Sequence, residues 1–60
     1  MKVKIEFEVE LPDDIKHTEQ ELEDFLRFEF NDNGSLSLKN PFAGRVYLEP
    51  VFGTFEWSRE

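Results

Sequence analysis

Three carboxylates stand at alternate positions near the start of the chain, at Glu6, Glu8 and Glu10. In an extended strand, residues two apart share one face, and their side chains repeat at roughly 7 Å. A row of fixed negative charge at this spacing can imitate a nucleic-acid backbone for a protein that binds DNA or RNA. The same row can instead serve only to keep a small Phe-rich domain in solution.

The excess of negative charge lies in the first half of the chain. Residues 1–32 hold eleven acids against four bases, whereas residues 33–60 hold three of each, for a net charge of −7. Glu19, Glu23 and Asp24 add carboxylates from a predicted helix to those of the first strand. Binding to phosphates needs basic surface, so this distribution argues against direct contact with nucleic acid and predicts a basic protein partner.

Catalytic chemistry has few candidate residues. His17 is the only histidine, there is no cysteine, and no Ser, Asp or Glu spacing selects a partner for His17. The serines lack a nucleophile-elbow context, and no Gly-rich phosphate loop is present. We therefore expect a protein that is not an enzyme, with no catalytic residues, no cofactor and no metal site.

One segment has helical periodicity, residues 18–34. Thr18 and Glu21 match a capping box, and Leu22, Phe25, Leu26 and Phe30 form one apolar stripe. The residues that follow, Asn31-Asp32-Asn33-Gly34, end the helix, and we expect Asn33 or Gly34 to take the left-handed conformation. A short helix is stable only if its apolar stripe packs against another element, and we predict that the stripe packs on the flanking strands.

The strongest strand signal is the strict alternation over residues 2–11, with Val3, Ile5, Phe7, Val9 and Leu11 expected to face the core. Shorter alternating segments follow at 35–39, 45–49 and 51–57, with Pro50 at an edge, bulge or bend. These elements predict a single α+β domain, residues 1–60. Its expected order is β-α-β-β, with a further strand if Pro50 makes a turn. Its sheet would have three or four strands and one helix packed on one face.

A second candidate surface is aromatic. Tyr47 and Phe52 fall out of phase with the inward positions, and Phe42 stands in a loop between Pro41 and Gly44. Phe42 either folds back as a lid on the core or is offered to a partner. Exposed aromatics mark protein interfaces, whereas Phe55 and Trp57 are predicted to belong to the core.

Residues 26–30 (LRFEF), 33–37 (NGSLS) and 40–42 (NPF), after an alternating strand that ends in Pro-Asp-Asp, resemble a type of short acidic hypothetical protein of phages and prophages. The resemblance implies a phage-encoded accessory protein without a known activity, and it transfers no site residues. Small acidic phage proteins are generally expected to bind and redirect a host protein, sometimes at its DNA- or RNA-binding site.

The predicted function is a non-enzymatic protein-binding module, such as a phage-type inhibitor or modulator of a basic host protein. Its partner-binding residues would be Glu6, Glu8, Glu10, Glu19, Glu23, Asp24, Phe42, Tyr47 and Phe52. The alternative is a small structural protein that assembles, for example as a homodimer, through an exposed strand edge. No apolar run approaches a membrane span, and the first ten residues lack the apolar region of a signal peptide, so we expect no membrane contact and a cytoplasmic location.

Overall fold

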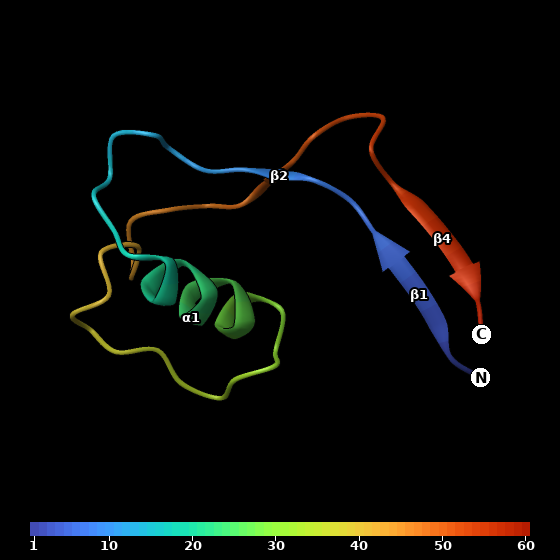
Figure 1. Cartoon of the computed structure of the whole chain (residues 1–60), viewed down its shortest axis with the longest axis horizontal. Coiled ribbons are helices and arrows are strands. Elements are labelled where there is room, and N and C mark those ends of the chain that lie inside the picture. The colour runs from blue at the N-terminus through green and yellow to red at the C-terminus, as the bar shows by residue number, and fades with distance from the viewer.

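The two ends of the chain pair with each other in a computed structural model that describes all 60 residues. The elements follow the order β1 (Val3–Glu6), β2 (Val9–Glu10), α1 (Glu19–Glu29), β3 (Glu49–Pro50) and β4 (Glu56–Arg59). β1 pairs antiparallel with β4, and β2 pairs antiparallel with β3. Figure 1 shows the result, a long two-stranded ribbon that leaves the helical part of the molecule and ends with the two termini side by side.

An offset separates the two ladders of the ribbon. Ile5 lies opposite Trp57 in the first ladder and Val9 opposite Pro50 in the second, so five residues of the C-terminal arm, 51–55, face only residues 7–8 of the N-terminal arm. The extra residues bulge out of the ribbon as a tight turn. Gly53 takes φ +84° in this turn, a conformation that favours glycine.

The helix forms because its local sequence specifies both of its ends. The Thr18 hydroxyl accepts from the Glu21 N–H at 3.2 Å, and the Glu21 carboxylate accepts from the Thr18 N–H at 2.8 Å, which confirms the capping box. At the other end, Asn31 takes the left-handed conformation at φ +63°, not Asn33 or Gly34 as expected. The helix therefore stops earlier than predicted, and an Arg27–Asp32 ion pair closes its last turn.

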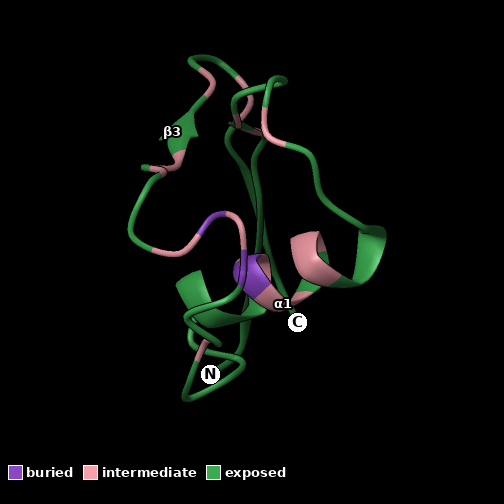
Figure 2. Ribbon diagram, turned by 90° about the vertical axis from the view of Figure 1, so that its left-hand side faces the viewer, coloured by how far each residue is buried: buried purple, intermediate pink, exposed green.

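The core consists of the helix and the loop after it. Phe25 and Phe42 are the two buried apolar side chains, and their rings stack with centroids 5.1 Å apart. The Asn40 side chain donates to the Glu21 carbonyl at 3.0 Å and accepts from the Phe42 N–H at 3.0 Å, which holds the loop against the helix. Figure 2 shows these buried residues next to each other, with exposed chain on nearly all other sides.

The structure bears out a small α+β fold but not the expected β-α-β-β order. The strands form two sheets of two strands each, and α1 lies against no strand. The expected strand at 35–39 is absent, and Leu38 in this segment is almost fully exposed. The loop after the helix covers the middle of the apolar stripe, where Phe42 stacks on Phe25, whereas Phe30 at its end is about half exposed and contacts Phe7.

Candidate functional site

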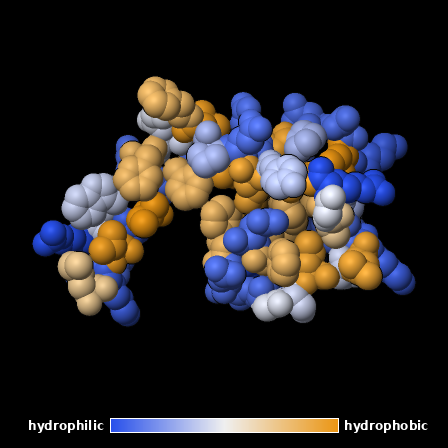
Figure 3. Space-filling model, turned by 180° about the vertical axis from the view of Figure 1, so that it is seen from behind, coloured by the Kyte–Doolittle hydropathy of each residue, from blue (hydrophilic) through white to orange (hydrophobic).

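The β1–β4 ribbon carries an exposed apolar face, one end of which contacts the helical part of the molecule, where the rings of Phe7 and Phe30 meet edge to face with centroids 5.8 Å apart. Residues directly opposite each other in an antiparallel pair share a face, which places Ile5 beside Trp57. Val3 lies two residues before Ile5 on β1. Phe7 comes directly after β1 and Phe55 directly before β4, and both continue the alternation of this face. We call these five residues the apolar ribbon face: Val3, Ile5, Phe7, Phe55 and Trp57. All five are exposed, and Figure 3 shows apolar side chains along the projecting ribbon.

The area of this face is large for so small a protein. Ile5, Phe55 and Trp57 are 55%, 61% and 58% exposed. Since an aromatic side chain presents roughly 150–250 Å², the exposed parts of the aromatics on this face amount to roughly 250–400 Å². The largest apolar patch of a typical monomer covers roughly 300–600 Å² and is often functional, and this face reaches that size on a chain of only 60 residues. The prediction that Phe55 and Trp57 belong to the core is therefore wrong, because more than half of each residue is exposed.

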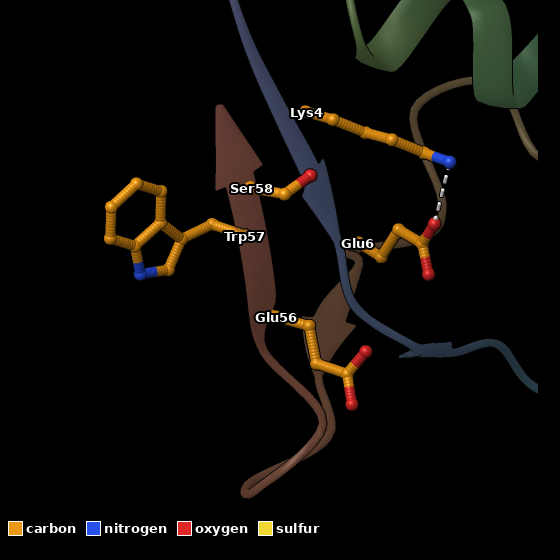
Figure 4. A pocket seen from close by; sticks show the side chains of 5 residues that line it. All are labelled: Lys4, Glu6, Glu56, Trp57 and Ser58. Carbon is orange, nitrogen blue, oxygen red and sulfur yellow. Dashed lines mark ion pairs between the residues drawn. The ribbon is translucent and has the colours of Figure 1, made fainter. Parts of the chain in front are cut away.

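The carboxylates occupy the other face of the ribbon. Figure 4 shows Trp57 pointing away from Lys4, Glu6, Glu56 and Ser58. Lys4 Nζ lies 3.1 Å from Glu6 Oε1, in an ion pair whose two side chains are about 60% exposed and which therefore contributes little stability. Glu56 stands directly opposite Glu6, and like charges in that position destabilise a strand pair.

The strand pairing extends the predicted acidic row. Glu6, Glu8 and Glu10 are exposed as expected, and Glu49 lies opposite Glu10 as Glu56 lies opposite Glu6. The sequence analysis missed these two cross-strand carboxylates. The sequence does contain a signal for them. Residues 49–57 alternate in the same way as residues 2–11, and pairing these two segments as antiparallel strands would have brought the acids together.

The carboxylates of the helix belong to a separate group. The Gln20 side-chain amide donates to Asp24 at 2.9 Å and to Glu23 at 3.4 Å, and Arg27 lies 3.9 Å from Glu23. Glu19 and Glu23 are exposed and Asp24 is half-buried. No hydrogen bond or ion pair joins this group to the acids of the strands, so the six predicted acidic residues form two patches.

The predicted aromatic anchors lie in three different settings. Phe42 is 0% exposed and fills the core, which corrects its assignment as a partner-binding residue. It is the lid of the helix, because its ring stacks on Phe25 and lies 4.8 Å from the His17 ring. Tyr47 is 92% exposed and Phe52 is fully exposed, so both are available to a partner.

Phe52 stands on a braced turn. The Thr54 hydroxyl donates to the Val51 carbonyl at 2.8 Å and accepts from the Glu8 N–H at 3.0 Å. The Val51 N–H also donates to the Glu8 carbonyl at 2.9 Å. Because these bonds fix the turn on both sides, the backbone presents Phe52 to solvent in a defined position.

His17 has one side-chain hydrogen-bond partner, and that partner is local. Its Nδ1 lies 2.8 Å from the Ile15 carbonyl oxygen, and the residue is exposed. No group of three or more His, Cys, Asp or Glu side chains is arranged to hold a metal ion. The one helix has eleven residues, which is below the length and apolar character that a bilayer crossing requires.

No family model, curated protein or solved structure matches this chain.

Proposed function

We propose that this protein is a non-enzymatic module that binds another protein, and that the apolar ribbon face is its docking surface. The observation that carries the proposal is the exposure of this face in a chain that buries only three residues. Interfaces are anchored by aromatic side chains, above all Trp and Tyr, in a centre from which water is excluded. Trp57 has this role here, and Phe52 on its braced turn adds a second anchor.

The proposed partner is a basic protein. The net charge of −7 gives an electrostatic field that attracts cationic surfaces and raises association rates. The acidic residues on the strands, joined by Glu49 and Glu56, and the acidic residues of α1 would steer the partner. The apolar ribbon face would then supply most of the affinity. A phage-encoded modulator of a basic host protein is the form of this function that the sequence resemblance favours.

The test compares three baits in affinity capture from bacterial lysate: the wild-type chain, Trp57→Ser, and Leu38→Ser as the control. Leu38 is exposed but lies outside the apolar ribbon face. We expect one basic protein in stoichiometric amount on the wild-type and Leu38→Ser baits, and its loss from Trp57→Ser. With the recovered protein purified, Trp57→Ser should weaken the measured Kd by about 30-fold, which corresponds to a hot-spot loss of about 2 kcal/mol.

Salt separates the two contributions to binding. The association rate should fall steeply between low and physiological ionic strength, since exposed charges are screened within about 8–10 Å. The dissociation rate should depend on Trp57. Equal retention of the partner by all three baits would refute the docking surface, and capture of an acidic protein would refute the electrostatic part.

The second candidate function is self-assembly through a strand edge. One observation favours it: both strands of the β1–β4 ribbon have an edge that pairs with no other strand of the chain. An unpaired edge offers its backbone N–H and C=O groups to another chain.

A further inference from the structure

One edge of β4 presents unpaired backbone groups. Along an antiparallel pair, backbone N–H and C=O groups alternate between the partner strand and the opposite side. The Glu60 N–H donates to the Lys2 carbonyl at 3.2 Å, which fixes the phase of this alternation. The groups of Trp57 and Arg59 therefore point away from β1. In Figure 1 this side of β4 is the outer boundary of the molecule, whereas β1 has its other edge toward the part that carries α1.

The sheet formed by β1 and β4 has only two strands. A pair of strands alone is marginally stable in water, and three or more strands with an apolar face are needed for independent stability. The β1–β4 pair extends away from the core, and α1 does not cover it. The same pair carries the like charges of Glu6 and Glu56 directly opposite each other. Additional strands along its free edge would therefore stabilise it.

We propose that a second copy of this chain supplies those strands: two β4 strands pair antiparallel about a two-fold axis through Trp57. The inference deepens the second candidate function, self-assembly through a strand edge, and rests on it. The resulting sheet has the order β1-β4-β4-β1. The axis is perpendicular to the sheet, so the apolar ribbon faces of the two copies lie on the same side and form one surface.

The charges of β4 select this register. With Trp57 on the axis, Glu56 lies opposite Ser58 of the partner subunit, and Phe55 lies opposite Arg59 of the partner subunit. A guanidinium beside an aromatic ring is a favourable pair, and Arg59 already lies 6.0 Å from the Trp57 ring within one chain. A slide of two residues one way puts Glu56 opposite Glu56 of the partner subunit, and a slide the other way puts it opposite the partner's Glu60. Of these three registers, the one on Trp57 is the one without a repulsive Glu–Glu pair.

The first test uses two substitutions at one position. In Ser58→Lys, each copy places an ammonium opposite Glu56 of the partner subunit, and in Ser58→Glu it places a carboxylate there. Two such pairs form per dimer, so we expect the dimer Kd to tighten by about two- to thirtyfold in the first variant and to weaken by about the same factor in the second. Sedimentation over a concentration series measures this Kd, and the fluorescence of Trp57, the only tryptophan, reports the same transition.

The two substitutions should affect the stability of the single chain in the opposite order to their effect on the dimer, and this difference makes the test specific. Ser58 lies opposite Lys4 within one chain, so Ser58→Glu gains an ion pair there and Ser58→Lys gains a repulsion. Dimer strength in the order Lys, Ser, Glu therefore supports the inference. The reverse order, or equal dimer strength, overturns it.

The second test places a cysteine on the axis of a chain that has none. In Trp57→Cys the two Cα atoms face each other in a hydrogen-bonded pair at about 5.5 Å, within the range of a disulfide. Mild oxidation should give a covalent dimer. The control is Ile5→Cys, which lies beside Trp57 on the same face but is separated from its copy by three strand spacings, about 14 Å. A covalent dimer of Ile5→Cys with none of Trp57→Cys would place the contact on β1 and overturn the inference.

The outcomes distinguish the inference from the function on which it rests. A wild-type chain that sediments as a monomer at every concentration refutes self-assembly itself, and the inference with it. The other case is a wild-type chain that dimerises with a Kd that does not change on substitution of residue 58, while the Trp57→Cys variant does not cross-link. This result refutes the β4 register but leaves self-assembly in place, through another surface.

Discussion

Replacing Phe42 by alanine should remove a large part of the stability of this protein. Phe42 is fully buried, stacks on Phe25 and contacts the His17 ring. Truncation of a buried phenylalanine costs about 3–5 kcal/mol through lost transfer energy and the cavity that remains. A chain of 60 residues has a free energy of unfolding of about 3–9 kcal/mol. Phe42→Ala should therefore be marginally folded or unfolded.

Phe52→Ala is the matched control, because it is the same chemical change at a fully exposed position. A surface substitution of this kind should change the free energy of unfolding by less than about 0.5 kcal/mol. Urea unfolding followed by far-UV circular dichroism measures both. Since urea unfolds small proteins with a slope of about 1 kcal/mol/M, Phe42→Ala should lower the midpoint by about 3–5 M, and Phe52→Ala should leave it nearly unchanged.

Phe42→Leu keeps the experiment informative if the alanine variant does not fold. It retains most of the buried volume and should cost less than about 1.5 kcal/mol. The reasoning fails if Phe42→Ala and Phe52→Ala shift the urea midpoint equally, since the loop that carries Phe42 would then not be the cover of the helix.

Three further substitutions test the local interactions by the same urea measurement. Thr18→Ala removes the helix N-cap and should cost about 0.5–2 kcal/mol, while Thr18→Ser should recover most of it; equal loss in both would deny the role of the hydroxyl. Asn40→Ala leaves two backbone groups without their partner and should cost about 1–3 kcal/mol, in contrast to a nearly neutral change at exposed Asn33. Gly53→Ala strains a residue at positive φ and should destabilise by about 1 kcal/mol, although its Cβ meets no atom, whereas Gly34→Ala should be neutral or stabilising.

The two proposals place the same ribbon in different assemblies. As a monomer, the protein offers a partner one apolar ribbon face, and as a β4-paired dimer it offers two of them on one side of a four-stranded sheet. A dimer that also binds the basic partner would carry two partner sites close together, and such bivalence raises the overall affinity without any new contact. The stoichiometry of the purified complex therefore connects the two experiments.

Local features of the fold could be predicted from the sequence. The capping box at Thr18 and Glu21 and the Glu23–Arg27 pair depend on residues three or four apart, and the structure has both. The alternation of residues 2–11 indicated a strand and its two faces. The structure has strands there, although Phe7 and Glu8 lie between β1 and β2.

The pairing of the strands could not be read in this way, because it joins residues about fifty positions apart. Alternation shows that a strand has an apolar face, but not whether another element covers that face. We therefore predicted from the sequence that Trp57 and Ile5 belong to the core, whereas both are exposed in the structure.

The composition, the charge of the first half and the start of the helix at Thr18 follow from the sequence alone, because they depend on residue identity and on neighbours along the chain. The tertiary structure decided which aromatic covers the helix and which remain exposed. Asn40 hydrogen-bonds the loop to the helix and Phe42 stacks on Phe25, so a loop buries the centre of the apolar stripe in place of a sheet. The strands pair with each other, and the residues of their apolar face remain exposed.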